Sequence, residues 1–549
     1  MPSKLSWGII GTGNIAGKFA AGLAVSKTGK LVAAGSRDIK KAGEFVQKYG
    51  GKAYGSYEEL LSDPAVEAVY ISTPHPFHAE WAIKAAEAKK HILCEKPIGI
   101  NHAEAMSIVD AARVNKVFLM EAFMYRCHPQ TKKLVELLKN KTIGEVRVIQ
   151  TAFAFNAGFS PESRLFKNAL AGGGILDVGC YCISMSRLIA GTANGKDFIE
   201  PLDVKSFGHL TETGVDGWAV GILKFPGDIL AEVSTGVQVT QQNVVRIYGS
   251  EGSIELTSPW FCNGKILLSK GGKTEEVAYD GSGNLYGIEA DTVAEFADKL
   301  KAASPAMSPE DTLGNMRACD MWRNGFDFFY DVEKDGAVIP TVDRRPLLAR
   351  KTNKMKYGKV PGVENNISRI VLGTMLEGQV FHRPAAHVLF DEFFRHGGNC
   401  FDTAYVYGGG KADITLGQWI KNRNIRKDAV VIAKGAHTPA CNPIDLKAQF
   451  LQSLDRMKTS YADIYMLHRD NSDIPAGEFI DVLNELKDKG LVKAFGGSNW
   501  CFERIEEANK YAASKGKTGF SVVSNNFSLA RLVEPMWGGC ISSSDADSK

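Results

Sequence analysis

A regular alternation of short apolar runs with amphipathic segments is the feature that most constrains this chain. In the N-terminal part, the strand-like runs that helical patterns separate lie at 5–10, 31–34, 68–72, 91–94 and 117–121. Strands joined by helices pair in parallel, because each helix carries the chain back to the start of the next strand. The pattern therefore predicts an α/β domain built of parallel βαβ units over residues 1–125.

The sequence changes in character after residue 125. Segments rich in β-branched and aromatic residues are separated by Gly, Asp and Ser, and two helical patterns follow them. This texture indicates an α/β domain with an open, mostly antiparallel sheet over residues 126–340. Residues 341–366 are basic and irregular, which predicts a solvated linker, with a basic partner-binding segment as the alternative.

A second alternation fills the C-terminal part and predicts a (β/α) barrel of TIM type over residues 367–549. Its strand-like runs lie at 370–374, 400–403, 430–433, 464–468, 494–498 and 521–524. A complete barrel has eight strands in ~250 residues, so we expect an incomplete barrel, truncated at its C-terminus. An unclosed sheet of this kind leaves two open edges, and we expect it to bind cofactor poorly.

A glycine-rich turn follows the first strand and opens the first helix. Gly11 permits a tight turn, and Gly13 lets a pyrophosphate approach the backbone. The helix that begins at Asn14 and Ile15 presents free N–H groups and a positive dipole end to an anion. The turn predicts dinucleotide binding, with a purely structural turn as the alternative.

The end of the second strand bears on the choice of dinucleotide. NAD-specific proteins tend to carry an acid there for the ribose 2′-hydroxyl, whereas an arginine suits the 2′-phosphate of NADP. Ser36 and Arg37 occupy that place, which favours NADP. Asp38 follows directly, so NAD stays possible.

Composition narrows the function classes. Hydrophobic residues make up 44% and charged residues 23% of the chain, as in ordinary globular proteins, and the net charge is only +3. Nothing here favours nucleic acid or an acidic membrane as partner. Ten cysteines form no CxxC pair, so no metal site is expected. The absence of a leader pattern and of an ~18-residue apolar run predicts a cytoplasmic protein.

Chemistry-bearing residues of the first part cluster in two motifs. Glu95 and Lys96 stand at a strand end, where open α/β sheets bind ligands, and a lysine there can polarise a hydroxyl. Asp177 and Tyr181 follow a triple glycine and lie four residues apart, on one face of a helix. Read singly, each could be an ordinary surface residue or helix cap.

The segments AVYISTPHPFHAE, ILCEKPIG, FLMEAFMYRCHP, RLFKNALAGGGILDVGCYCI and IYGSEGSIEL together resemble the Gfo/Idh/MocA oxidoreductases. The resemblance covers residues 4–340 and is strongest to the branch of dihydrodiol dehydrogenases and NADP-dependent D-xylose dehydrogenases. It implies that Lys96 contacts cofactor and substrate and that Tyr181 replaces the family's usual histidine as acid/base. It also implies that Lys96 lowers the pKa of Tyr181, beside Asp177.

The same resemblance implies further binding residues. Those expected to line the nicotinamide side are Thr73, Pro74 and His75, Glu95 is expected to bind the cofactor, and those expected to shape the substrate pocket are Arg126 and His128. For the fold, the resemblance implies a Rossmann domain followed by an α/β domain with an open sheet. The family's open sheet often forms a dimer interface, so a homo-oligomer is expected.

Four residues of the second part come from strand ends or from the loops just beyond them, where barrel active sites lie. Asp402, Tyr407, Lys434 and His468, in FDTAYVYG, VVIAKG and DIYMLHR, resemble the aldo-keto reductase tetrad. The resemblance implies Tyr407 as general acid, Lys434 with Asp402 as its pKa-lowering partner, and His468 as the substrate-orienting residue. Ser498 and Asn499 would contact the carboxamide of NADPH.

The sequence thus predicts a bifunctional oxidoreductase that acts on small molecules. Its first part would transfer hydride between NADP and a sugar or diol hydroxyl, and its second would reduce carbonyl compounds with NADPH. One alternative is an NAD-dependent glycoside hydrolase on the same fold, which would show no net redox change. Another is a non-catalytic dinucleotide-binding sensor, against which the retained Lys96, Asp177 and Tyr181 argue.

Overall fold

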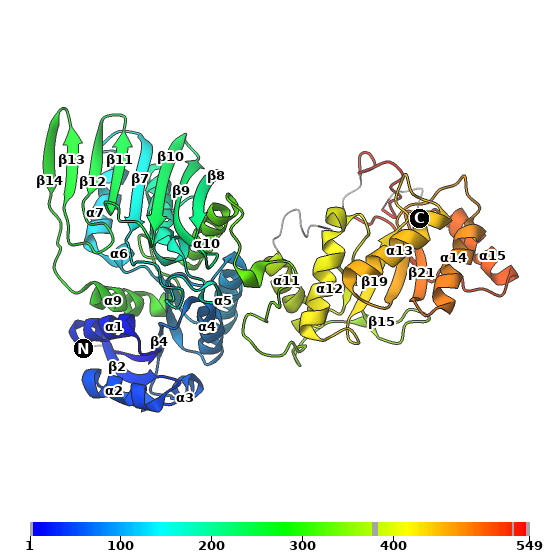
Figure 1. Ribbon diagram of the computed structural model, residues 1–549, viewed down its shortest axis with the longest axis horizontal. Helices are drawn as coiled ribbons and strands as arrows, with labels where there is room; N and C mark the ends of the chain where they lie inside the picture. Colours follow the sequence, from blue (N-terminus) through cyan, green and yellow to red (C-terminus); the bar gives the residue numbers. More distant parts are fainter. Residues whose placement is uncertain (1–3, 376–382, 530–531, 545–549) are drawn as a thin grey trace. The chain divides into compact units, whose positions relative to one another are not determined.

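The computed structural model describes residues 4–375, 383–529 and 532–544. The chain divides into two compact units, residues 1–334 and 335–549. Figure 1 draws both units, and each is described by itself. One described helical stretch, 168–193, is long and apolar enough to cross a membrane, but 89% of its most apolar window is buried inside the first unit. That burial is typical of a core helix.

The first unit begins with a six-stranded parallel sheet in the order β3-β2-β1-β4-β5-β6. The helices α1 to α5 connect these strands (Figure 1), and the alternation of apolar runs predicted all of these elements except β3 and α3. The strands are β1 Leu5–Ile10, β2 Gly29–Gly35, β3 Lys52–Tyr54, β4 Ala68–Ile71, β5 His91–Glu95 and β6 Leu119–Ala122. The connecting helices are α1 Asn14–Val25, α2 Ile39–Tyr49, α3 Tyr57–Ser62, α4 His78–Glu87 and α5 His102–Asn115. The order reverses between β1 and β4, where doubly wound sheets bind their ligands.

The second sheet of this unit has eight strands in the order β14-β13-β12-β11-β7-β10-β9-β8 (Figure 1). The strands are β7 Val146–Ala154, β8 Asp203–Leu210, β9 Asp216–Phe225, β10 Ile229–Gly236, β11 Val244–Gly249, β12 Gly252–Leu256, β13 Ile266–Lys270 and β14 Lys273–Val277. All neighbouring pairs are antiparallel except β7 with β10. The mostly antiparallel sheet predicted from the sequence is therefore present, with one parallel pair.

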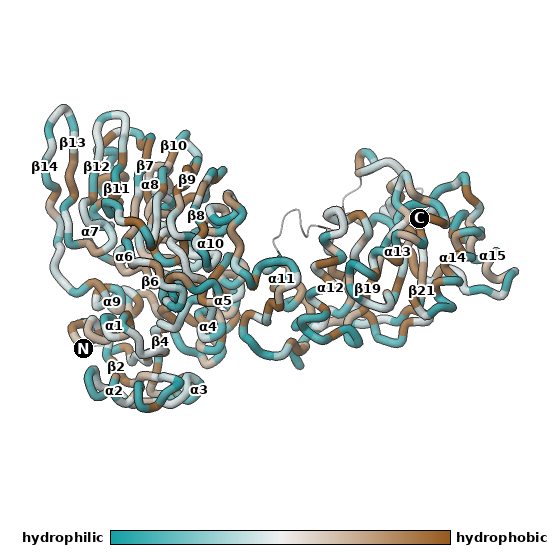
Figure 2. The backbone as a smooth tube through the Cα atoms, in the orientation of Figure 1, coloured by the Kyte–Doolittle hydropathy of each residue, from teal (hydrophilic) through white to brown (hydrophobic). Residues whose placement is uncertain are grey.

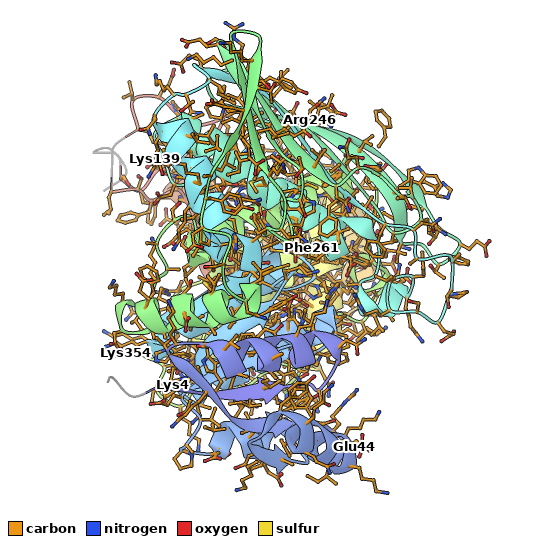
Figure 3. The ribbon with its side chains drawn as sticks, turned by 90° about the vertical axis from the view of Figure 1, so that its left-hand side faces the viewer. Lys4, Glu44, Lys139, Arg246, Phe261 and Lys354 are labelled. Carbon is orange, nitrogen blue, oxygen red and sulfur yellow. The ribbon has the colours of Figure 1, made fainter. Side chains whose placement is uncertain are left out.

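Helices pack on one face of the eight-stranded sheet. They include α8 Cys180–Ala193 and α10 Pro309–Asn324, and α9 Leu285–Phe296 packs on α1 of the nucleotide domain. From Gly217 onward, buried and exposed residues alternate along β9, so its side chains point in turn to the covered face and to the open face of the sheet. Figure 3 draws the side chains of this sheet, with Arg246 of β11 labelled. Figure 2 shows the contrast between the hydrophobic strand β13 and the hydrophilic edge strand β14.

The second unit contains a six-stranded parallel sheet in the order β17-β18-β19-β20-β21-β22. The strands are β17 Leu372–Gly373, β18 Cys400–Asp402, β19 Val430–Gly435, β20 Ala462–Leu467, β21 Val492–Ser498 and β22 Val522–Ser524. The helices of this unit are α11 Arg383–Arg395, α12 Lys411–Arg423, α13 Pro443–Met457, α14 Ala476–Asp488 and α15 Phe502–Ser514. Each predicted strand has its counterpart, and the described residues form an incomplete (β/α) barrel in which β17 and β22 are the edge strands.

The segment expected to be a solvated linker is instead partly packed on the second unit. We call residues 337–347 the strap. Arg423 donates to the carbonyl of Ile339 and to the carboxylate of Asp391. Asp343 forms an ion pair with Arg395 at 3.1 Å, and Leu347 is buried in the main core of this unit. The basic side chains of residues 341–366, among them Lys351 and Lys354, are exposed, whereas Asp343 and Leu347 are buried against the unit.

Candidate functional site

The glycine-rich turn has the geometry that dinucleotide binding requires. Gly11 has a φ of +92°, which favours glycine, and a side chain there would press on the carbonyl of Ser72. Above Gly13 the space is open, since a Cβ added there would meet nothing within 4 Å. Helix α1 has no side-chain cap in the described structure. Its first N–H groups are therefore available to a pyrophosphate.

Arg37 and Asp38, which follow β2, differ in the contacts that their side chains make. Asp38 is the N-cap of α2, and its carboxylate accepts a hydrogen bond from the Lys40 N–H at 3.0 Å. Arg37 is exposed, and the hydroxyl of the buried Ser36 accepts a hydrogen bond from the Asp38 N–H. The acid is thus engaged at the helix start, while the arginine is accessible to a ligand.

Lys96 lies at the centre of the first candidate site, directly after β5. Its ammonium donates to the carbonyl oxygen of Asp177 at 2.6 Å and lies 5.2 Å from the ring centre of Tyr181. The Asp177 carboxylate accepts a hydrogen bond from Arg164 at 2.8 Å. Burial raises the pKa of Asp177, but the two cations Lys96 and Arg164 outweigh burial and hold that pKa below its usual range.

Tyr181 is enclosed by aromatic rings. Its ring stacks on Tyr125 and meets the edges of three others, Phe123, Phe153 and Trp260. The hydroxyl points to the sulfur of Met124 at 3.5 Å rather than to Lys96. Burial, followed by the charge of Glu95, raises the pKa of Tyr181 well above its usual value. The expected lowering by Lys96 is therefore absent here, because the ammonium faces the ring and not the phenol oxygen.

The residues expected along the nicotinamide lie at the ends of β4 and β5. His75 shares a hydrogen bond with the carbonyl of Ala171 at 3.1 Å, and burial lowers its pKa to about 3, so it is neutral near pH 7. Pro74 precedes it as the N-cap of a short 3₁₀ turn. The hydroxyl of Thr73 is buried with no hydrogen-bond partner among the described residues, which suits a ligand contact. Glu95 accepts a short hydrogen bond from Tyr70.

The two predicted pocket residues are separate from this cluster. Arg126 is almost fully buried and donates to Asp311 at 2.6 Å, to Ser184 at 2.7 Å and to the carbonyl of Pro305. His128 is the N-cap of α7 Pro129–Lys139, and its Nδ1 accepts from the Gln130 N–H. These contacts favour structural roles. Substrate contact by Arg126 and His128 stays a prediction.

The second unit assembles its four predicted residues at the ends of three consecutive strands. Lys434 forms an ion pair with Asp402 at 2.7 Å and lies 5.0 Å from the ring centre of Tyr407. The rings of Tyr407 and His468 meet edge to face at 5.6 Å. Burial, followed by the charge of Lys434, lowers the pKa of His468 to about 2, so the imidazole is neutral.

The two residues expected at the carboxamide of NADPH border this group. Ser498 donates to the carbonyl of Ser524 at 2.8 Å, and the Asn499 side chain accepts from the Ile541 N–H. The Asn499 amide also donates to the His468 carbonyl, at 3.5 Å. Their contact with a cofactor stays a prediction.

Sequence reasoning missed three features of these sites. Arg164 could have been suspected as a cation on the loop before the triple glycine. The aromatic enclosure could not, because Trp260 comes from a segment remote in sequence. His437 lies with its ring 4.9 Å from that of His468, at the second site. Across the described ranges, no group of three or more His, Cys, Asp or Glu side chains could hold a metal ion.

Family models match both units. The NAD-binding Rossmann fold domain of the GFO/IDH/MocA oxidoreductase family matches residues 5–123, and the C-terminal domain of that family matches residues 131–255. The aldo/keto reductase family matches residues 369–536.

The relatives by sequence are named dehydrogenases. The chain is 36% identical over 267 residues to trans-1,2-dihydrobenzene-1,2-diol dehydrogenase of Homo sapiens, covering 48% of this chain and 78% of that protein. The protein of the same name from Xenopus laevis is 35% identical over 317 residues, covering 56% of this chain and 93% of its own length.

Solved structures share the fold over part of this chain. KijD10, a 3-ketoreductase from Actinomadura kijaniata, superposes with a TM-score of 0.53 at 23% identity, covering 59% of this chain and 98% of its own. The aldose-aldose oxidoreductase of Caulobacter crescentus gives a TM-score of 0.53 at 23% identity, covering 59% and 97%. The family models and the sequence relatives show that the chain belongs to the Gfo/Idh/MocA family of NAD(P)-dependent oxidoreductases and carries an aldo/keto reductase family domain in its second unit.

Proposed function

We propose that the first unit is an NADP-dependent dehydrogenase that oxidises a hydroxyl group of a sugar or diol. The observation that carries the proposal is the cluster of Lys96, Asp177, Arg164 and Tyr181 beside an open glycine-rich turn. A bound nicotinamide ring would accept the hydride from the carbinol carbon. The names of the sequence relatives support a diol, and those of the structural neighbours support sugars, as the substrate class.

Lys96 and Tyr181 would assist the transfer of the proton that leaves the substrate hydroxyl. Asp177 holds Lys96 through its carbonyl, so the remaining N–H groups of the ammonium are free to donate to the reacting oxygen. Such a cation stabilises the negative charge that develops on that oxygen as its proton leaves. Tyr181 would accept this proton after its own phenol proton has been released to water, once its hydroxyl turns from Met124 toward the substrate.

We further propose that the second unit carries a carbonyl reductase site. The grouping of Asp402, Tyr407, Lys434 and His468 supports this role. Because His468 is neutral, it can orient a carbonyl oxygen by donating a hydrogen bond, while Tyr407 supplies the proton.

The test of both proposals is an absorbance assay at about 340 nm, where reduced nicotinamide absorbs. The full chain is mixed with NADP and a panel of aldoses and diols, and in a second series with NADPH and a panel of aldehydes and ketones. Reduction of NADP in the first series supports the dehydrogenase. If the protein binds cofactor and cleaves glycosides but the absorbance changes in no mixture, the dehydrogenase proposal is rejected.

The cofactor preference leads to a mutational prediction. Replacing Arg37 with alanine is expected to weaken NADPH binding by about 10- to 100-fold, because a charge-assisted contact to the 2′-phosphate contributes roughly 1.5–3 kcal/mol. NADH binding should stay unchanged, since Asp38 is engaged in capping α2. Fluorescence titration of the full chain measures both affinities. Lys48→Ala, an exposed cation at the far end of α2, is the matched control. Equal losses for NADPH and NADH would contradict the assignment.

We propose a homodimer through the open face of the eight-stranded sheet. Exposed apolar side chains gather there on β8, β9 and β10, namely Phe207, Trp218, Val220, Ile222 and Leu230. Phe207 is 78% exposed and pairs across the strands with Val220. Apolar patches of this extent mark interaction surfaces, and a twofold axis lets one patch cover its own copy.

A charge placed in this patch tests the dimer. Ile222→Glu is expected to raise the dimer dissociation constant at least ~10-fold, because a carboxylate buried without a partner costs more than ~1.4 kcal/mol. Sedimentation of the wild type and the variant over a range of concentrations measures the constant. Val114→Glu, on the exposed side of α5, is the control. A wild type that stays monomeric, or an Ile222→Glu variant that dimerises equally well, would contradict the proposed dimer.

A further inference from the structure

A buried acid lies directly beneath the triple glycine, outside the residues assigned so far. Asp216 is the first residue of β9 and is fully buried. One carboxylate oxygen accepts a hydrogen bond from the Ile175 N–H at 2.8 Å. The other oxygen has no hydrogen-bond partner among the described residues. Gly173, with a φ of +107°, fits against this oxygen because any Cβ there would overlap it.

The turn that Asp216 holds leads straight into the active-site cluster. Residues Ile175–Gly179 form one π-helical turn, a rare conformation that is frequent at functional sites. The Asp177 N–H donates to the Gly173 carbonyl at 3.2 Å, and the Asp177 carbonyl in turn accepts from Lys96. Lys96 is therefore joined to this turn through Asp177, and the contact between Asp216 and Ile175 is one of those that hold the turn.

Other groups hold the same turn without changing charge near neutral pH. The hydroxyl of Tyr330 donates to the Gly172 carbonyl at 2.7 Å, and that of Thr235 donates to the Gly174 carbonyl at 3.1 Å. Asp216 differs from both, because burial raises its pKa to about 7, despite the backbone hydrogen bond from Ile175. The pKa shift therefore places a change of charge inside the physiological range.

The charged surroundings of Asp216 are few. Arg323 on α10 is the cation that acts on it, and this guanidinium is already paired with Glu333 at 2.8 Å and Asp320 at 2.9 Å. The phenol of Tyr330 is the other titratable neighbour, and its pKa is raised far above neutrality. Asp216 is thus the group at this turn that titrates near pH 7 in the described structure.

We infer that Asp216 is a positioning residue for the dehydrogenase site. Its ionised carboxylate helps to hold the glycine turn and thereby the placement of Asp177 and Lys96. The hydrogen bond from Ile175 lowers the pKa of Asp216 and therefore favours the ionised form, so protonation of the acid while it stays buried weakens this contact and loosens the turn. Hydrogen bonds to an ionised acceptor are roughly twice as strong as those to a neutral one. The inference rests on the proposed dehydrogenase function for its effect on turnover, but the ordering of the turn can be measured without turnover.

Kinetics of the full chain test the effect on turnover, with Asp216→Asn as the variant. The wild-type kcat is expected to fall about tenfold as the pH decreases through about 7. At alkaline pH the variant should have a kcat about tenfold lower than that of the wild type, and its kcat should not decrease further as the pH falls through about 7. KM should change little, because Asp216 does not touch substrate. Asp203→Asn removes an exposed carboxylate at the start of the adjacent strand β8 and should behave as the wild type.

Hydrogen exchange of residues 172–181 provides the second readout. In the wild type, protection of the Ile175 amide should decrease as Asp216 protonates, after correction for the intrinsic exchange rate. In Asp216→Asn it should be low at all pH values. This pattern in a chain that oxidises none of the panel would support the positioning role and reject the proposed function. Protection independent of pH in the wild type, or a variant with unchanged kcat profile and exchange, would overturn the inference.

Discussion

Tyr181→Phe should lower the kcat for sugar or diol oxidation by about 10²- to 10⁴-fold, the usual contribution of a general acid or base. The variant removes one oxygen and leaves the ring, whose packing against Tyr125, Phe153 and Trp260 needs no hydroxyl. The lost contact is a weak one to the sulfur of Met124, so the fold should be kept. NADPH affinity should also stay the same, because the glycine-rich turn is untouched. Steady-state kinetics and fluorescence titration measure the two effects.

The matched control lies in the other unit. Tyr407→Phe should leave the oxidation of sugars or diols unchanged and should lower carbonyl reduction by a similar factor, since Tyr407 belongs to the cluster of Lys434 and His468. Together the two variants assign each activity to its own unit. Turnover within twofold of the wild type in Tyr181→Phe would remove Tyr181 from the mechanism and would leave Lys96 as the group to test next.

Asp311→Ala should destabilise the first unit by about 3–5 kcal/mol, because it leaves the buried Arg126 without a counter-charge and Arg187 with Glu200 alone. Asp311 is almost fully buried on α10 and forms ion pairs with Arg126 at 2.6 Å and Arg187 at 2.5 Å. The measurement is urea unfolding of the full chain, followed by circular dichroism, with the transition of each unit fitted separately.

An exposed acid of the same unit provides the control for this variant. Asp110→Ala removes the surface pair with Arg113 and should cost less than ~0.5 kcal/mol. The result also decides the role of Arg126. A variant at Asp311 that is as stable as the wild type but has a raised KM would show that Arg126 serves the substrate, as the family resemblance implied, and not the core.

Residues at strand ends were predictable because their placement follows from topology alone. Once Gly11 ends one parallel strand and Lys96 another, the strand order brings both to the same edge of the sheet. The same holds for Lys434 and His468, which end neighbouring strands of the second unit. In these cases, the pattern of apolar runs specifies the sheet, and the sheet specifies the site.

Contacts made by side chains across distant segments were not predictable in this way. The direction of the Tyr181 hydroxyl depends on four rings from three separate segments, and the hydrophobic periodicity of the sequence does not indicate how they pack. The family resemblance placed Arg126 at the substrate pocket. Its side chain is instead buried in an ion pair with Asp311, which is distant in sequence. The parallel pairing of β7 with β10 also escaped prediction, because alternation of exposed and buried residues is the same for both strand directions.

The strap has a practical consequence for anyone who wishes to study the two catalytic units apart. A gene cut at the first residue of the predicted barrel would discard Leu347 from the core and would leave Arg423 and Arg395 only their acceptors on α11, Asp391 and Glu392. Division between residues 334 and 335 would keep each unit's interior whole. The folding unit is therefore longer than the predicted barrel, because the upstream strap forms part of its interior.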